Sequence, residues 1–261
     1  MVKYSPKIMG ILNITPDSFY DGNSNLSTEN VIDKIKALEL ADIIDVGCES
    51  SRPGADAVDV FEEMDRLNMA LDLLPTNKKP HSIDTSKYEI ADYAIRNGFT
   101  IINDITAGKN DERIFELAAE SNSQIILMHM LRNPKTMQDN PKYDSLIDNI
   151  LEYLDTRVNL AKSYSIKEEN IIIDPGIGFG KTSSDNIVIV KNINRFKDMG
   201  YRVLLGHSRK QFLQFNDDTP KDRMPATIGV TAYAAMKEVD IVRVHDVKET
   251  KSMLNTITKL C

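Results

Sequence analysis

The stretch IIIDPGIGFGK at residues 171–181 decides the fold, because an unbroken apolar run ends abruptly in Asp174 and a glycine-containing loop follows. Such runs are typical of strands that are covered on both faces in a parallel sheet. Seven similar runs recur along the chain, and a segment with helical periodicity follows each of them. The eight runs are KIMGILN (7–13), IIDVG (43–47), HSIDT (81–85), TIINDI (100–105), QIILMHM (124–130), IIIDPG (171–176), RVLLGHS (202–208) and DIVRVHD (240–246). Repeated βα units predict a single (β/α)8 (TIM) barrel, with an open doubly wound sheet as the alternative.

The composition is that of an ordinary globular protein. The chain has 261 residues, of which 41% are hydrophobic, and only 12 Gly and 10 Pro, so disordered and collagen-like classes are excluded. No Pro/Gly/Ser-rich linker and no shift in composition divides the chain. We therefore expect one domain over residues 1–261.

Charge and cysteine content restrict the partners and the compartment. Lys and Arg number 32 against 39 Asp and Glu, a net charge of −7, and no block of basic residues is present, so neither nucleic acid nor an anionic membrane is a predicted partner. The cysteines Cys48 and Cys261 are too few for a disulfide framework. The start, MVKYSPKIMGILN, lacks the apolar core of a signal peptide, and no run has the length of a membrane span. A cytoplasmic protein with a small-molecule substrate is expected.

Polar residues stand where the predicted strands end. They are Asn13, Glu49 with Ser51 and Arg52, Asp84, Asn103 with Asp104, His129, Asp174, Ser208 with Arg209 and Lys210, and Arg243 with His245 and Asp246. In a (β/α)8 barrel the carboxyl ends of the strands meet at one mouth, where the chemistry of such enzymes takes place. The alternative is that each residue caps the helix that follows, which Asp84-Thr85-Ser86 also fits. So many converging polar groups predict a polar ligand.

The strand ends divide by charge. Asp84, Asn103 and Asp174 supply acceptors suited to the amidine-like edge of a pterin or guanine. Cationic donors follow the last two strands, where barrels commonly bind phosphate; they are Arg209, Lys210, Arg243 and His245. Asn13 offers an oxygen for Mg²⁺, although an asparagine that forms a turn before Ile14-Thr15-Pro16 explains it equally well.

Other local signals are weaker. The segment DPGIGFGK (174–181) matches neither a dinucleotide-binding nor a Walker A pattern, and we interpret it as a mobile loop that presents Phe179 and Lys181 to the mouth. The segment TPDSFYDGN (15–23) is suited to closing over a substrate. Ser86 and Glu89 have the spacing of a capping box.

Taken together, the motifs resemble those of the dihydropteroate synthases, a pterin-binding (β/α)8 family. The resemblance covers essentially the whole chain in the family's order: GILNITPDSFYDG, IIDVGCESSRPGA, SIDTSK, IINDITAG, LMHM with NPKTMQ, IIIDPGIGFGK, LLGHSRK and IVRVHDVKET. It implies condensation of 6-hydroxymethyl-7,8-dihydropterin diphosphate with 4-aminobenzoate to give 7,8-dihydropteroate and diphosphate. It also implies a homodimer.

The resemblance assigns roles to individual residues. Asp84, Asn103, Asp174 and Lys210 correspond to the pterin pocket. Asn13, Arg243 and His245 correspond to the diphosphate site, with Mg²⁺ at Asn13. The aminobenzoate site corresponds to Ser51, Arg52, Pro53, Phe179 and Ser208, with Lys210 beside it. Lys210, Arg243, His245 and Asp84 are the expected catalytic residues.

The expected chemistry is a dissociative displacement. Mg²⁺, Arg243 and His245 would stabilise negative charge on the leaving diphosphate, and no enzyme nucleophile is required. Loops containing Tyr20, Asp21, Ser51 and Arg52 would order over the site and exclude water. Cys48 and Ser51 depart from the glycine and threonine usual in the family. A pterin-binding module without activity and a barrel that transfers methyl groups from a folate to a corrinoid are the alternatives; neither needs the diphosphate cluster.

Overall fold

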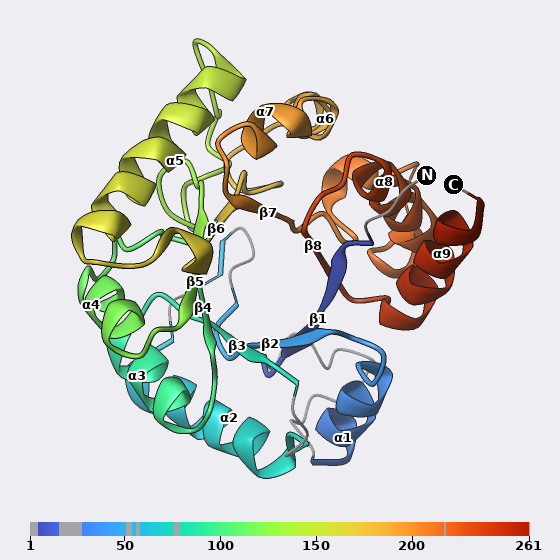
Figure 1. Cartoon of the computed structure of the whole chain (residues 1–261). Helices are drawn as coiled ribbons and strands as arrows, with labels where there is room; N and C mark the ends of the chain where they lie inside the picture. The colour runs from blue at the N-terminus through green and yellow to red at the C-terminus, as the bar shows by residue number, and fades with distance from the viewer. Residues whose placement is uncertain are drawn as a thin grey trace.

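A computed structural model describes residues 5–15, 28–50, 54–55, 58–75, 79–216 and 218–260. Within these residues, eight parallel strands close into a barrel in chain order (Figure 1). The strands are β1 (Lys7–Asn13), β2 (Ile43–Gly47), β3 (His81–Asp84), β4 (Ile101–Asp104), β5 (Gln124–Met128), β6 (Ile171–Asp174), β7 (Arg202–Leu205) and β8 (Ile241–Val244). The predicted (β/α)8 barrel is confirmed, and the open sheet is wrong because β1 pairs with β8.

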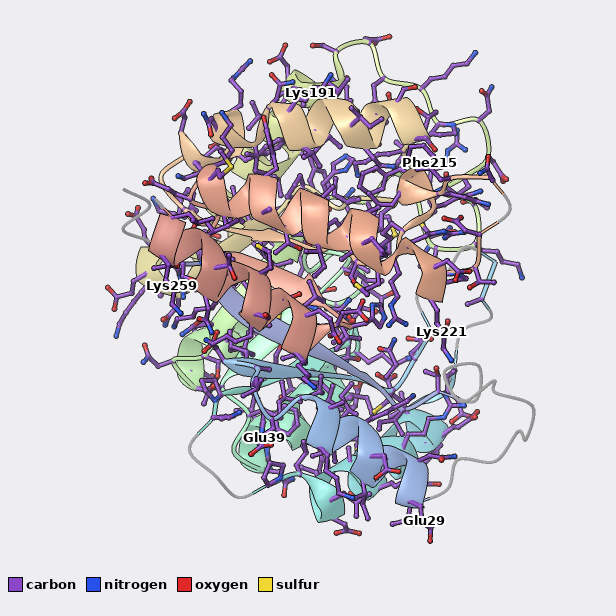
Figure 2. The ribbon with its side chains drawn as sticks, turned by 90° about the vertical axis from the view of Figure 1, so that its right-hand side faces the viewer. Glu29, Glu39, Lys191, Phe215, Lys221 and Lys259 are labelled. Carbon is purple, nitrogen blue, oxygen red and sulfur yellow. The ribbon has the colours of Figure 1, made fainter. Side chains whose placement is uncertain are left out.

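Helices lie around the outside of the barrel (Figure 1). They are α1 (Thr28–Ala37), α2 (Val60–Leu73), α3 (Tyr88–Arg96), α4 (Arg113–Glu120), α5 (Leu146–Ser163), α6 (Ser183–Lys191), α7 (Ile193–Lys197), α8 (Met224–Met236) and α9 (Val247–Leu260), with short 3₁₀ turns η2 (Glu168–Asn170), η3 (Gln211–Leu213) and η4 (Lys221–Arg223). Figure 2 shows Glu29 and Lys221, near the starts of α1 and α8, on one side of the molecule and Lys259, in the last turn of α9, on the opposite side. None of the helices described is long and apolar enough to cross a membrane.

The inside of the barrel has an apolar layer and a polar layer. Seven buried side chains, each from a different strand, form an apolar cluster of their own: Met9, Ile43, Ile101, Ile126, Ile172, Leu204 and Ile241. Side chains two positions apart in a strand point to the same face. Four of these strands therefore place a polar residue directly above the apolar one, two positions further on: Asp45, Asn103, Asp174 and Arg243.

The strand register aligns residues of the candidate site. Asn13 pairs with Gly47, Gly47 with Asp84, and Asp84 with Asn103, so these four residues form one row across β1 to β4. A Cβ atom on Gly47 would lie 3.1 Å from Asn13 Oδ1 and 3.7 Å from Asp84 Oδ2. The missing side chain leaves room between these two oxygens.

The predicted capping box at Ser86 is wrong. Helix α3 has Lys87 as its N-cap residue, without a side-chain cap hydrogen bond. The Ser86 hydroxyl and carbonyl accept hydrogen bonds from Asn110 instead, because the chain is still in the loop at this residue. A complete capping box is present at the start of α6, between Thr182 and Asp185.

Candidate active site

Arg243 lies at the centre of the polar layer. Its Nε is 2.6 Å from Asp45 Oδ2, and its Nη2 is 2.6 Å from Asp84 Oδ2. Asn103 Nδ2 donates a hydrogen bond to the same oxygen of Asp45 at 3.2 Å. Guanidinium–carboxylate hydrogen bonds are among the strongest in proteins because both partners are charged. The structure thus joins Arg243 to the predicted pterin residues Asp84 and Asn103.

Asp45 is a member of this cluster that the sequence analysis missed. Its side chain is fully buried, and its Oδ1 has no hydrogen-bond partner among the described residues. A buried acceptor without a partner costs about 1 to 3 kcal/mol, so this oxygen favours a ligand that donates a hydrogen bond to it. The available signal was the sequence IIDVG, in which one charged residue interrupts an otherwise apolar strand.

Asp84 titrates close to neutral pH. Burial raises the pKa of its carboxyl group to about 7, the Arg243 guanidinium opposes this effect, and the Asp45 carboxylate adds to it. The ionised form accepts hydrogen bonds only, whereas the protonated form also donates. Asp84 therefore changes its hydrogen-bonding character near pH 7.

Asp174 comes from the opposite side of the barrel. Its Oδ1 accepts a hydrogen bond of 2.7 Å from the backbone N–H of Gly176. Burial raises the pKa of Asp174 to about 6, although that hydrogen bond and the charges of nearby cationic groups lower it. A Cβ on Gly206 would lie 3.7 Å from Asp174 Oδ2 and 4.0 Å from Arg243 Cβ, so this glycine leaves space between the two residues.

Lys210 follows β7 and lies beside the same carboxylates. Burial, together with the positive charge of Arg243, lowers the pKa of its ammonium group to about 8. Its Nζ lies 4.2 Å from the centre of the Phe179 ring. A cation over an aromatic face is attracted by the electron density of the ring. The predicted pterin residue Lys210 and the predicted aminobenzoate residue Phe179 are therefore in contact.

Ser208 and His245 form a second contact between predicted subsites. Ser208 Oγ accepts a hydrogen bond of 3.1 Å from the His245 backbone N–H and lies 3.0 Å from His245 Nδ1. Ser208 is buried, and His245 directly follows β8. The hydroxyl thereby fixes the histidine at the end of the strand.

Arg209 differs from its expected role as a cationic donor for phosphate. Its guanidinium forms an ion pair with Asp246 through Nε and Nη2, and the Nε–Oδ2 distance is 3.0 Å. Its backbone has a left-handed φ of 56°, and its N–H donates to Thr227 Oγ1. The backbone turn directs this side chain to Asp246, which satisfies its charge.

Lys181 does not face the mouth, contrary to our interpretation of its loop. The side chain is 3% exposed, and its Nζ lies 2.9 Å from His129 Nδ1. Burial lowers the pKa of Lys181 to about 7 and that of His129 to about 2, with the Lys181 charge adding to the latter effect. The predicted mouth residue His129 is likewise buried, because it directly follows β5 and Gly176 of this loop packs against it.

Asn13 is compatible with a magnesium ion bound partly through substrate. The described residues contain no group of three or more His, Cys, Asp or Glu side chains arranged to hold a metal. The amide oxygen of Asn13 borders the space that Gly47 leaves open, and an Asp84 oxygen borders the same space. Mg²⁺ commonly binds one or two protein oxygens and takes its other ligands from phosphate and water. The oxygen donors present fit such an ion.

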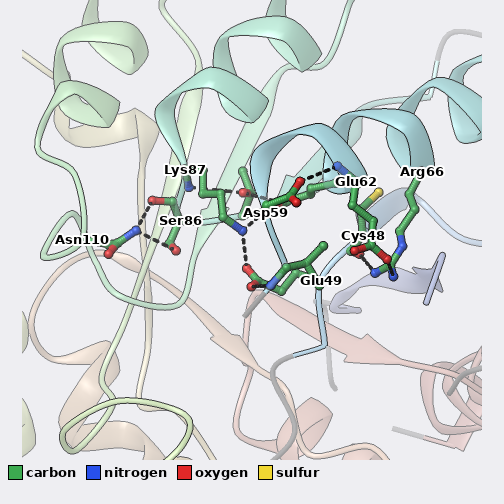
Figure 3. Close-up of polar contacts among 11 residues, drawn as sticks. Cys48, Glu49, Asp59, Glu62, Arg66, Ser86, Lys87 and Asn110 are labelled. Carbon is green, nitrogen blue, oxygen red and sulfur yellow. Dashed lines mark hydrogen bonds and ion pairs between the residues drawn. The ribbon is translucent and has the colours of Figure 1, made fainter. Parts of the chain in front are cut away.

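The predicted aminobenzoate residues Ser51, Arg52 and Pro53, and the loop residues Tyr20 and Asp21, lie outside the described residues. The chain on either side of residues 51–53 is held by charged groups (Figure 3). Glu49 Oε1 accepts a hydrogen bond of 2.8 Å from the Val58 N–H, and Glu49 Oε2 lies 2.8 Å from Lys87 Nζ. Lys87 also pairs, at 2.5 Å, with Glu63, which is fully buried. This network joins the end of β2 to α2 and to the start of α3.

A family model and individual known proteins assign this chain to the same family. The family described as pterin binding enzyme matches residues 9–245. A dihydropteroate synthase of Clostridium beijerinckii is 41% identical over 247 residues, which cover 93% of this chain and 89% of that protein. A longer protein of Haloferax volcanii, a probable bifunctional folylpolyglutamate synthase/dihydropteroate synthase, is 37% identical over 95% of this chain but only 30% of its own length.

Solved structures agree with these matches. The structure of Yersinia pestis dihydropteroate synthase with a sulfonamide drug superposes with a TM-score of 0.92 at 33% identity, covering 98% of this chain and 94% of that one. The structure of the Xanthomonas albilineans enzyme in complex with 7,8-dihydropteroate superposes with a TM-score of 0.86 at 29% identity, covering 100% of this chain and 95% of that one.

Proposed function

The chain belongs to the pterin-binding enzymes of the dihydropteroate synthase family, and on this basis we propose that it condenses 6-hydroxymethyl-7,8-dihydropterin diphosphate with 4-aminobenzoate. The products are 7,8-dihydropteroate, the ligand of the Xanthomonas albilineans structure, and diphosphate. The observation that carries the proposal is the contact of Arg243 with Asp84 and Asp45 inside the barrel. This contact places a cation within a group of acceptors suited to a pterin.

The carboxylates bind the pterin in this scheme. Asp84 and Asp174, with pKa values raised to about 7 and about 6, accept hydrogen bonds from ring N–H and amino groups when ionised. Asn103 supplies an amide that both donates and accepts, and Lys210 donates to a ring carbonyl or nitrogen. Asp45 adds the buried oxygen Oδ1, which has no partner among the described residues.

The cations bind the diphosphate. Arg243 and His245 lie at the end of β8, where negative charge develops on the leaving oxygens. When bound at Asn13, Mg²⁺ supplies Lewis-acid stabilisation of the same charge. Asn13 holds its amide oxygen in the row of residues that contains Asp84, so that pterin and diphosphate sites adjoin.

Aminobenzoate occupies the side formed by Phe179 and Ser208. The resemblance adds Ser51, Arg52 and Pro53 to this subsite. The bond from the exocyclic methylene carbon to the diphosphate oxygen breaks first, and the neutral amine then attacks that carbon. The electron pair of the broken bond leaves with diphosphate, and the nitrogen that forms the new C–N bond releases one proton to solvent. The electron-rich dihydropterin carries the positive charge in between, so no side chain forms a covalent bond. Lys210, Arg243, His245 and Asp84 are the proposed catalytic residues.

The proposal is tested by giving purified protein both substrates, with Mg²⁺ or with excess chelator, and separating the products by chromatography. Dihydropteroate formed only with the metal is the expected result. Saturable pterin binding without product would support a non-catalytic pterin-binding module instead. Transfer of a methyl group from a methylated folate to a corrinoid would support the other alternative.

We further propose that the protein is a homodimer in which a second copy covers the outward face of α8. This helix, MPATIGVTAYAAM, is apolar all round, and Tyr233 and Met236 are among its exposed side chains. Helices that are apolar on every side are typically buried. Analytical ultracentrifugation tests this, and Met236→Glu is expected to give monomers. The cytoplasmic location suggested by the low cysteine content stays a prediction.

A further inference from the structure

The ammonium group of Lys181 is fully used inside the protein. Its Nζ lies 2.9 Å from His129 Nδ1, 3.2 Å from the His129 carbonyl oxygen and 3.0 Å from the Phe179 carbonyl oxygen. When protonated, this nitrogen has three N–H donors and no acceptor, so each donor has a partner within the described residues. The neutral amine keeps two N–H donors, enough for the two carbonyl groups. In the protonated form the ammonium only donates, so His129 Nδ1 accepts and the imidazole proton is on Nε2. A buried lysine saturated in this way is a fixed part of the loop and is not available to substrate.

His129, which contacts the Lys181 nitrogen, is itself held in place by its neighbours. Its ring packs edge-on against Tyr153 with a centroid distance of 4.9 Å, and its backbone N–H donates to the Asp174 carbonyl at 2.9 Å. Gly176 passes directly against it, since a Cβ there would lie only 1.9 Å from the His129 carbonyl oxygen, and its φ is 71°. The end of β5 therefore forms a rigid base for the loop after β6.

Two further hydrogen bonds hold the outer part of this loop. The Tyr143 hydroxyl donates to the Gly180 carbonyl at 2.8 Å, and Gln138 Nε2 donates to the Gly178 carbonyl at 2.6 Å. Between these two glycines lies Phe179, whose ring faces the Lys210 ammonium at 4.2 Å. The only cation bound to the Phe179 backbone among the described contacts is Lys181.

We propose that Lys181 is a positioning residue for the second substrate. By binding the carbonyl groups of His129 and Phe179, it fixes the Phe179 ring relative to Lys210, and so sets the affinity for aminobenzoate. The inference rests on the proposed function, because that function assigns aminobenzoate to the side of the site containing Phe179 and the pterin to the carboxylates. Lys181 touches neither substrate and acts through the loop.

The test is Lys181→Met, which keeps the length of the side chain and removes its donors. With saturating pterin diphosphate at pH 8, where Asp174 is ionised, we expect the KM for 4-aminobenzoate to rise at least tenfold. The kcat and the Kd for pterin diphosphate alone, measured by calorimetry, are expected to change less than threefold. Lys191→Met, at the exposed end of α6, is the matched control and leaves all three values unchanged.

A double-mutant cycle separates positioning from general support. In a Phe179→Leu background, Lys181→Met is expected to raise the KM for aminobenzoate by less than threefold, because the ring it positions is gone. If Lys181→Met folds poorly, Lys181→Gln, which retains two donors on one nitrogen, is expected to show a smaller increase in the same KM.

Three results would overturn the inference. They are a fall in Tm with an unchanged KM, an equal loss of pterin affinity, and a full tenfold effect in the Phe179→Leu background. An inactive wild-type protein would instead contradict the proposed function.

Discussion

Arg243 on β8 and Asp84 on β3 form an ion pair, with 2.6 Å between Nη2 and Oδ2. The resemblance assigns the arginine to the diphosphate and the carboxylate to the pterin ring, so in the proposed function the two parts of one substrate would contact residues that are bound to each other. A change of charge on either residue therefore alters the environment of the other. Asp45, bound to the same guanidinium at 2.6 Å, extends this coupling to β2.

Replacing Arg243 with methionine is expected to destabilise the fold as well as abolish activity. The change leaves Asp45 buried without its cation, and removing one partner of a buried ion pair costs about 3 to 5 kcal/mol. Urea unfolding measures this loss. Asp45→Asn in the same chain is expected to restore most of the stability but none of the turnover. A single variant as stable as wild type would contradict the role of Arg243 in compensating buried charge.

Pterin affinity is expected to fall as the pH drops from 8 to 6. The pKa of Asp84 is raised to about 7. Below that pH the carboxyl group is mostly protonated, and its ionised form, which only accepts hydrogen bonds, is lost. Between pH 8 and pH 6 the ionised fraction falls about tenfold. Calorimetric titration with a dihydropterin measures the change. In Asp84→Asn, binding should be weak and should lack the transition near pH 7; a transition that persists unchanged would assign it to another group.

Lys210→Ala is expected to lower kcat by about 100-fold or more, the effect typical of removing one electrostatic donor from an active site. The fold should remain, because Lys210 is only partly buried and lies in a loop outside the apolar clusters. Circular dichroism gives Tm alongside the kinetics, with Lys191→Ala as control. A Tm that collapses together with activity would show a structural role.

Asn13→Ala is expected to raise the Mg²⁺ concentration required for half-maximal turnover. The substitution removes the amide oxygen that lies in the space beside Gly47, while β1 keeps its backbone pairing. Activity measured against metal concentration, with metal removed beforehand by chelator, tests this. Full turnover in excess chelator would exclude a metal from the reaction.

The strands were predictable because each is a short, largely apolar run that polar or glycine-containing segments follow. The bounds of β1 and β2 match the predicted runs, whereas β5 ends at Met128 rather than residue 130. His129 still donates its backbone N–H to the Asp174 carbonyl, but His129 and Met130 lie beyond the end of the strand. An apolar run in the sequence does not show at which residue the pairing between strands ends.

The members of the site were easier to predict than their contacts. Asp84, Asn103 and Asp174 could be proposed because they lie at or next to the ends of apolar runs, and Arg243 because His245 and Asp246 follow it closely. Asp45 was missed because Val46 and Gly47, rather than polar residues, end its run. The predicted direction of the Lys181 side chain was wrong because that direction depends on acceptors of His129, which is 52 residues away in the sequence. Arg209 was misjudged for a similar reason, since its partner Asp246 is 37 residues distant in sequence.

The apolar cluster of Met9, Ile43 and the five side chains around them has a consequence for the electric field of the site. It seals the barrel below the polar layer, so water and dissolved ions reach those charges from one end only. At 0.1 M salt, interactions between exposed charges more than about 10 Å apart are largely screened, whereas buried pairs are screened much less. The attraction of Arg243 to Asp45 and Asp84 should therefore persist at salt concentrations that screen the surface ion pairs.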